Sequence, residues 1–294
     1  NVFLEKPVAV DPVGARQIIA TSKKAESMGL TVVCGTQRRH QHDYLETYRQ
    51  VASVAIGEIT AAKAWWLQTH VWFRTREESW SDMEYMLRNW NNFCWLCGDH
   101  FLDTHVHNID VVNWFVGKYP ESAIGFGGRV RRLTGDQYDF FSVDFDFGNG
   151  IFSHSMSRQI DGCANSLGEL VVGTEGYTNC VNTVFNHDGT IKWQYEYPKT
   201  RDGKSTGLTK ISPYVQEHID MVTAIRSHKP VVEAERTAIS NLTAIMGRTA
   251  AYTGQKVTWE DMMNSAERLG PAEYVMGPVD MDFPVPLPGI QHKE

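Results

Sequence analysis

The chain of 294 residues lacks several features that would place it in familiar classes. It has no apolar run approaching the eighteen or more residues that a membrane-spanning helix needs. Its formal net charge of −7 gives no support for a nucleic acid or an anionic membrane as a partner. The content of 42% hydrophobic residues is that of a globular protein. The length of 294 residues suits one large or two ordinary domains.

Cysteine is scarce, and its pattern favours neither a disulfide framework nor a metal site. The five cysteines are an odd number at irregular spacing. Cys94 and Cys97 form a C-x-x-C pair, but no second pair stands at zinc-finger spacing. His105 and His107 are two apart, so on a helix they point to different faces and cannot easily hold one ion. We expect buried or pocket-lining thiols and no metal.

A short apolar strand at the start of the chain ends in an acid, a base and a proline, Glu5-Lys6-Pro7. Proline fixes its own φ, has no N–H and biases the residue before it toward extended geometry, so the strand stops there. Lys6 is therefore predicted at a strand end, where open α/β sheets bind their ligands.

A second polar pattern lies in residues 98–117. Apolar residues recur there at helical spacing, and Gly117 is placed to end the helix. Asp103 and His107 are four apart and share one face, and Asp110 extends the same stripe. A carboxylate beside an imidazole can orient it for general acid/base catalysis. The alternative is an ordinary amphipathic helix with a solvated Asp/His face.

Together these two patterns resemble the signatures of the Gfo/Idh/MocA oxidoreductases, the family of glucose–fructose oxidoreductase and inositol dehydrogenase. The resemblance implies an NAD- or NADP-dependent enzyme that oxidises a CH–OH group of a sugar, polyol or cyclitol by hydride transfer to nicotinamide. By that resemblance His107 takes the hydroxyl proton, Lys6 bridges substrate and cofactor, and Asp103 orients His107. One departure is the sequence Cys97-Gly98-Asp99-His100, which stands where the family has a glycine run.

The remaining candidate site residues follow from the same resemblance and from their chemistry. A polar turn with two arginines follows a buried-looking strand over 31–35, and residues 72–97 are rich in tryptophan, arginine and asparagine. Aromatic faces and amide or guanidinium donors suit a polyol, although tryptophans also fill cores and interfaces. The predicted cofactor contacts are Glu5, Lys6, Pro7, Gln37 and Arg38. The predicted substrate contacts are Arg39, Trp90, Asn91, His100 and Asn108.

The predicted fold combines α/β and α+β parts in three segments. Residues 1–40 are expected to be the C-terminal remnant of a Rossmann dinucleotide-binding domain. Residues 41–270 are expected to form a mostly antiparallel, open-faced sheet with helices on one face, and residues 271–294 an extended Pro-rich tail. Strands are predicted over 59–69, 123–133, 139–147, 150–157 and 167–173, and helices over 11–28, 43–56, 98–117, 212–228 and 235–253. The resemblance implies a dimer or tetramer built through the open sheet.

The phosphate-binding turn Gly-x-Gly-x-x-Gly does not occur anywhere in the sequence. The simplest expectation is that a longer protein carries this turn ahead of Asn1, together with any export signal, which leaves a cytoplasmic or periplasmic location open. Two other functions also stay open. One is an NAD-dependent glycoside hydrolase that oxidises its substrate transiently, and the other is a non-catalytic assembly module without its cofactor half.

Overall fold

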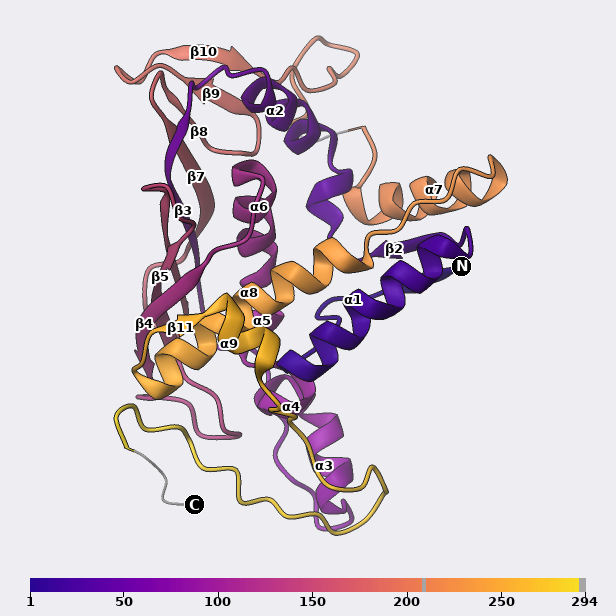
Figure 1. Ribbon diagram of the computed structural model, residues 1–294, viewed down its shortest axis with the longest axis vertical. Helices are drawn as coiled ribbons and strands as arrows, with labels where there is room; N and C mark the ends of the chain where they lie inside the picture. Colours follow the sequence, from indigo (N-terminus) through magenta and orange to yellow (C-terminus); the bar gives the residue numbers. More distant parts are fainter. Residues whose placement is uncertain (208–209, 291–294) are drawn as a thin grey trace.

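The computed structural model describes residues 1–207 and 210–290 (Figure 1). Its strands are β1 (Val2–Leu4), β2 (Val32–Cys34), β3 (Ile59–Gln68), β4 (Ser122–Gly128), β5 (Phe140–Asp146), β6 (Phe152–Gln159), β7 (Ser166–Gly173), β8 (Tyr177–Thr178), β9 (Thr183–Phe185), β10 (Ile191–Gln194) and β11 (Val257–Thr258). Within the described residues β1 and β2 form a small parallel sheet. The other nine strands form one large sheet in the order β10-β9-β8-β7-β3-β6-β5-β4-β11. All its pairs are antiparallel except β3 with β6, as the predicted fold class requires.

The longer helices are α1 (Pro12–Ser27), α2 (His42–Ala52), α6 (Val106–Val116), α7 (Pro213–Arg226) and α8 (Ala234–Thr253). The shorter ones are η1 (Gln37–His40), α3 (Asp82–Arg88), η2 (Trp90–Asn92), α4 (Cys94–Cys97), α5 (His100–Asp103) and α9 (Trp259–Asn264). Helix α1 begins as its sequence predicts, because Asp11 caps it by accepting from the Gly14 N–H at 2.7 Å and Pro12 fits the first turn.

Two predicted elements end differently in the structure. The single helix predicted over 98–117 is wrong: it divides into α5 and α6, because the His105 N–H bonds to the carbonyl of His100, five residues back, and opens the turn. The strand predicted over 123–133 stops at Gly128. Beyond it the Asp139 carboxylate accepts hydrogen bonds from the backbone N–H groups of residues 130–132 and curls the chain into a turn.

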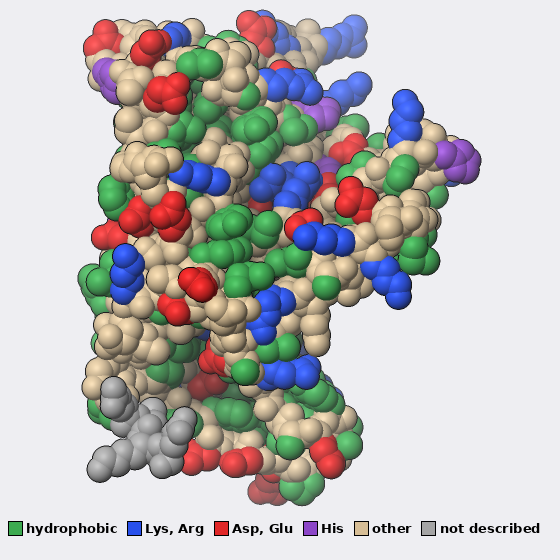
Figure 2. All heavy atoms as spheres, viewed as in Figure 1, with side chains coloured by type: hydrophobic (Ala, Val, Ile, Leu, Met, Phe, Trp, Pro, Cys, Tyr) green, Lys and Arg blue, Asp and Glu red, His purple; other side chains and the backbone are tan. Residues whose placement is uncertain are grey.

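Helices α6 and α8 cover one face of the large sheet, and its other face is open within the described residues (Figure 1). Val143, Phe145 and Val171 point toward the helices and are buried. Residues on the opposite face, such as Phe126, are exposed. This alternation is the period of two predicted from the sequence. Figure 2 shows the molecule from the same viewpoint as Figure 1, with cationic and anionic side chains interspersed among apolar ones.

The small parallel sheet is enclosed by segments from both ends of the chain. Helix α1 lies on one side of it and α7 on the other (Figure 1). The Phe3 ring lies 4.4 Å from the His218 ring of α7, and Val32 forms a parallel bridge with Val232. The part of the structure built from residues 1–40 therefore also contains a later segment of the chain, which follows residue 210.

Residues 271–290 run in extended form along α3, α4 and the end of the large sheet. The Met83 N–H donates to the carbonyl of Gly277, and the Tyr138 hydroxyl donates to the carbonyl of Pro286 at 2.8 Å. The tail thus covers an apolar cluster formed by Met83, Met86, Phe93 and Trp95.

The cysteines and the length of the helices can also be compared with what the sequence predicts. Four of the five cysteines are buried, Cys163 is exposed, and all five are free thiols. Among the described helices, none has both the length and the apolar character needed to cross a membrane.

Candidate active site

The end of β1 and the end of α5 meet at an ion pair. The Lys6 ammonium donates to the backbone carbonyl of Asp103 and lies 3.1 Å from the Oδ1 of its carboxylate. The two side chains are 19% and 18% exposed, so the pair is open to a ligand on one side. The two motifs recognised in the sequence therefore meet in space although 97 residues separate them.

His107 lies one turn beyond Asp103, in the first turn of α6. Burial is the main cause that holds the pKa of its imidazole well below the ordinary value, and the positive charges of Lys6 and Arg38 lower it further. The ring is therefore neutral around neutral pH and can accept a proton. Asp103 was predicted to orient His107. In the structure its carboxylate is paired with the Lys6 ammonium.

A second ion pair lies near His107. The Arg38 guanidinium, from η1, contacts the Glu169 carboxylate of β7. It also lies 5.7 Å from the ring centroids of both Tyr44 and Trp66. The Trp66 ring is in turn 6.1 Å from the His107 ring, and the Tyr44 hydroxyl donates to Glu169 at 3.1 Å. Arg38, predicted as a cofactor contact, thus forms part of the wall behind His107.

Glu169, Tyr44 and Trp66 are site residues that the sequence reasoning missed. Glu169 carried a usable signal, because it stands on the same face of its strand as the buried Val171. An acid on the buried face of a strand needs a cation or several hydrogen-bond donors. Its partner Arg38 is 131 residues away, so the sequence alone gave no way to choose it.

The carboxyl ends of β1 and β2 lie against one another beside Lys6. A Cβ built on Gly35 would lie 2.3 Å from the Glu5 carboxylate, so glycine permits this close approach of the Glu5-Lys6-Pro7 turn. Thr36 and Gln37 follow on β2, and their Oγ1 and Oε1 atoms are buried without a hydrogen-bond partner among the described residues. A ligand at this edge of the sheet would find these two oxygens available.

Arg39 points away from this edge and is held by Asp110. Its Nε and Nη2 lie 2.8 and 2.9 Å from the two carboxylate oxygens, and the Ser240 hydroxyl donates to Oδ1 at 2.7 Å. The guanidinium also lies 5.0 Å from the Trp114 ring centroid. This bidentate pair engages the guanidinium that was predicted to contact substrate, and it ties η1 to α6.

The predicted substrate contacts His100 and Asn108 are both buried among protein partners in the structure. His100 is 3% exposed, and its two ring nitrogens lie 2.9 Å from Asp99 Oδ1 and 3.0 Å from Ser157 Oγ. Asn108 is fully buried, and its amide donates to the carbonyls of Trp65 and Gly168. Both side chains support α5 and α6 on the sheet through these contacts.

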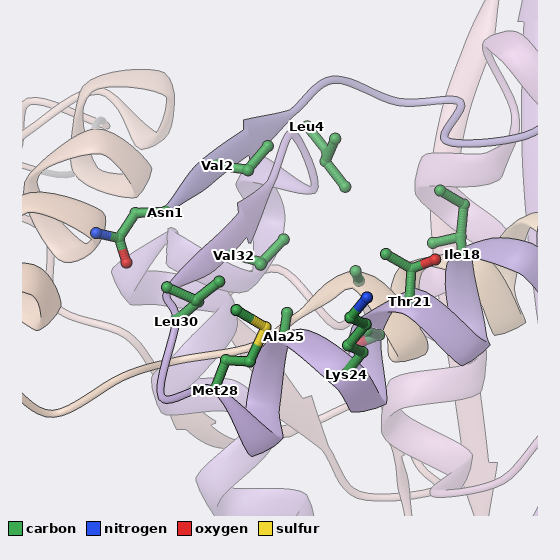
Figure 3. Close-up of a pocket in the computed structure, with 12 residues that line it drawn as sticks. Asn1, Val2, Leu4, Ile18, Thr21, Lys24, Ala25, Met28, Leu30 and Val32 are labelled. Carbon is green, nitrogen blue, oxygen red and sulfur yellow. The ribbon is translucent and has the colours of Figure 1, made fainter.

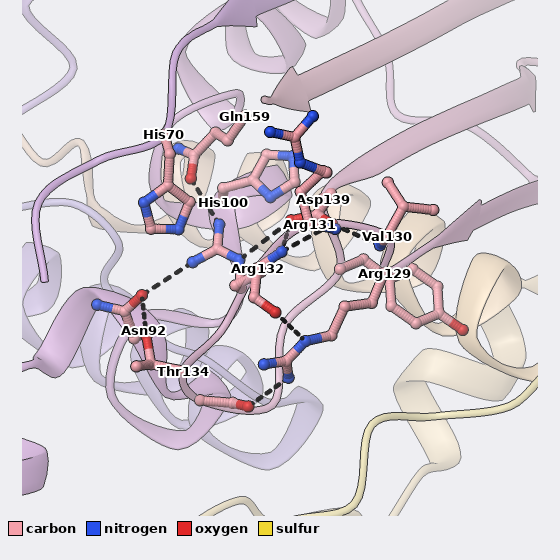
Figure 4. A network of polar contacts seen from close by, with 12 residues as sticks. His70, Asn92, His100, Arg129, Val130, Arg131, Arg132, Thr134, Asp139 and Gln159 are labelled. Carbon is pink, nitrogen blue, oxygen red and sulfur yellow. Dashed lines mark hydrogen bonds and ion pairs between the residues drawn. The ribbon is translucent and has the colours of Figure 1, made fainter. Parts of the chain in front are cut away.

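Trp90 and Asn91 lie in η2 beside a separate polar network. The Trp90 ring packs edge-on against Trp72 at 6.3 Å, and the Asn91 amide donates to the Trp72 carbonyl. Next to them Arg132 donates to Asn92 and Gln159, as Figure 4 shows. In the described part of the chain, no hydrogen bond or ring contact joins Trp90 or Asn91 to Lys6, Asp103 or His107.

A hollow of about 440 Å³ lies between β1 and α1 (Figure 3). Its lining is almost entirely apolar and includes Leu4, Ile18, Met28 and Leu30. Lys24 is the one side chain among the lining residues that carries a charge. The hollow therefore offers no acid/base chemistry, and the polar centre around Lys6 and His107 remains the candidate active site.

Comparison with known proteins supports the fold. No protein-family model matches the chain. An uncharacterized oxidoreductase of Streptococcus pneumoniae is 24% identical over 196 residues, which are 65% of this chain and 48% of that relative. The chain thus spans about half the length of the curated relative it matches.

Solved structures match a larger share of the chain. An oxidoreductase from Thermotoga maritima superposes with a TM-score of 0.64 at 18% identity, over 89% of this chain and 72% of that one. GenD2 from gentamicin A biosynthesis, solved in complex with NAD, gives 0.62 at 18% identity over 88% and 71%. Myo-inositol 2-dehydrogenase from Lactobacillus plantarum gives 0.60 at 20% identity over 88% and 73%. These likenesses show that the chain has the fold of such dehydrogenases.

Proposed function

We propose that this chain carries the substrate-facing part of an NAD(P)-dependent oxidoreductase of the Gfo/Idh/MocA type. The enzyme would oxidise a CH–OH group of a sugar, polyol or cyclitol. The observation that carries the proposal is that Lys6 pairs with Asp103, one turn before His107, so that a held ammonium lies near a neutral imidazole. The fold shared with solved dehydrogenases supports it.

The residues at the ends of β1 and β2 fit the nicotinamide end of such a cofactor. The unpartnered oxygens of Thr36 and Gln37 can accept hydrogen bonds from its amide or hydroxyl groups, and Lys6 stands beside them. When bound, the nicotinamide ring would take up the hydride from the substrate carbon. Because the sequence has no Gly-x-Gly-x-x-Gly turn, the proposal assigns only this end of the cofactor to these residues.

The chain's own residues then perform the proton transfer. Neutral His107 accepts the proton of the substrate hydroxyl as the carbonyl forms. The Lys6 ammonium stabilises negative charge that develops on the same oxygen, and Asp103 fixes the direction of that ammonium. Once protonated, His107 lies near two positive charges, Lys6 and Arg38, so it releases its proton readily for the next cycle.

We also propose that the open face of the large sheet joins copies of this chain. Ile124, Phe126 and Phe152 are on that face, and they are 57%, 65% and 53% exposed. Their strands, β4 and β6, are both paired with β5, so these apolar side chains stand on neighbouring strands of one surface. Exposed apolar surface of this kind is typical of protein–protein contacts.

The activity is tested in the full-length protein with NAD⁺ or NADP⁺ and a panel of sugars, polyols and cyclitols, by following reduced nicotinamide. His107→Asn and Lys6→Met should each lower kcat/KM by roughly 10²-fold or more. Arg88→Met is the matched control, because Arg88 pairs with Glu84 and stacks on Trp80 in α3, outside the site.

Wild-type rates in both site variants would refute the assignment. Release of sugar from a glycoside without net reduced nicotinamide would replace the dehydrogenase by the hydrolase alternative. If the protein bound neither nicotinamide cofactor, the non-catalytic assembly module would be the remaining alternative.

A further inference from the structure

The charged groups around His107 are arranged as two ion pairs from four separate elements. Lys6 at the end of β1 pairs with Asp103 of α5, and Arg38 of η1 pairs with Glu169 of β7. In both pairs the acid is engaged by its own cation, and after burial the two cations Lys6 and Arg38 act most strongly on His107. The imidazole therefore lies near two positive charges.

The other titratable neighbours add no charge to this arrangement. His105, on the same helix as His107, lies 2.7 Å from the Ser155 hydroxyl, and burial lowers its pKa to about 3, so it is neutral. Burial also raises the pKa of Tyr44 well above its ordinary value, so its hydroxyl stays protonated and donates to Glu169. The field at His107 is thus set by Lys6 and Arg38.

The two pairs differ in exposure. The Lys6 and Asp103 side chains are about one-fifth exposed, whereas Arg38 is 11% and Glu169 only 1% exposed. A substrate oxygen that develops negative charge would share the Lys6 ammonium. Arg38 is screened from substrate by its own partner and by the aromatic rings on which it lies. Its charge therefore stays constant through the reaction, and a guanidinium does not deprotonate at working pH.

We propose that the Arg38–Glu169 pair is a positioning element for His107: it fixes a positive charge and the Trp66 ring near the imidazole, and so adds to burial in favouring the neutral form of that ring. The inference deepens the proposed function and rests on it for its catalytic meaning. Neither residue touches the reacting atoms in this scheme, because both act through His107. The alternative is a pair that only holds η1 against β7.

The test measures the titration of His107 by NMR without cofactor or substrate, with His107→Asn used to assign the resonance. The double variant Arg38→Met, Glu169→Gln removes both charges at similar volume and leaves no unpaired buried ion. The proton affinity of His107 should then rise by roughly tenfold or more, because a like charge at close range has been removed. Glu169→Gln alone leaves Arg38 uncompensated and should change the affinity in the opposite direction.

Two further variants separate the electrostatic role from a structural one. Arg38→Lys keeps the charge and should largely restore the wild-type titration, and Arg88→Met should leave it unchanged. In turnover assays the acid limb of kcat/KM should move to higher pH in the double variant and return toward the wild-type position in Arg38→Lys.

The inference is overturned if His107 titrates as in the wild type in every one of the two variants, the double variant and Glu169→Gln, that folds. The single Glu169→Gln variant keeps this test available even if the double variant does not fold. The titration also separates this inference from the proposed reaction. A shifted titration without nicotinamide-dependent turnover would support the electrostatic role of the pair and refute the proposed function.

Discussion

Asp99 is the residue at which this chain departs from the glycine run of the resembled family, and its replacement gives a sharp test of the packing beneath the site. It is fully buried with a φ of +73°, a conformation that costs a non-glycine residue roughly 1–3 kcal/mol. Its carboxylate accepts hydrogen bonds from the backbone N–H groups of His100 and Tyr138 and from the Tyr252 hydroxyl. These three donors hold the turn that leads into α5.

Asp99→Ala would remove all three hydrogen bonds, at about 1–3 kcal/mol each, so we expect a loss of about 5 kcal/mol. Asp99→Gly loses the same hydrogen bonds but relieves the strained φ, so its loss should be smaller, about 3 kcal/mol. Urea denaturation followed by circular dichroism measures both. Asp144→Ala, which replaces an exposed carboxylate on β5, should stay within about 0.5 kcal/mol of the wild type.

The same network predicts a pH dependence. Burial alone raises the pKa of Asp99, but hydrogen bonds and charges from His100, Arg132 and Tyr252 outweigh it and hold the pKa below its ordinary value of 3.8. The carboxylate therefore contributes its stability above that value, and the contribution is lost as the pH falls below it. If Asp99→Gly proves as stable as the wild type, the strain outweighs the hydrogen bonds and this reasoning is refuted.

Three other perturbations test separate parts of the structure. Phe126→Glu places a charge on the open sheet face and should convert an oligomer to monomers in light scattering, whereas an unchanged mass would place the interface elsewhere. Gly98→Ala should unfold the protein at lower temperature, because Gly98 has a φ of +80° and a Cβ there would lie 2.2 Å from the Leu102 side chain; an unchanged Tm would contradict that geometry. Asn108→Leu removes the amide that donates to the carbonyls of Trp65 and Gly168. The free energy of unfolding in urea should fall by roughly 2–4 kcal/mol. A fall below about 0.5 kcal/mol would show that water replaces the amide.

Much of the fold could be predicted because its signals are local. The alternation of Phe141, Val143 and Phe145 marks a strand with one buried face, and the Asp11-Pro12 pair marks the start of a helix. The break between α5 and α6 could not be read in this way. It depends on a hydrogen bond from His105 to His100 that competes with the regular helical one, and nothing in the local apolar spacing reveals it.

The candidate site was predictable only where it follows a motif. Lys6 and Asp103 stand in two recognisable patterns, and the structure places them in contact. The wall behind His107 was not predictable, because Arg38 and Glu169 come from parts of the chain whose pairing depends on the whole sheet. The burial of His100 was not predictable either, because the sequence beside a motif does not show whether a polar side chain is exposed.

The central claim is that Lys6 and His107 act as one unit on the same substrate oxygen, and a double-mutant cycle tests it most directly. The kcat/KM of Lys6→Met, His107→Asn and the double variant would be measured at one pH in the full-length protein. Residues that act on a single proton transfer are strongly non-additive, so we predict that the double variant loses little more than the worse single variant. Losses that simply multiply would show that the two groups act independently and would contradict this account of the site.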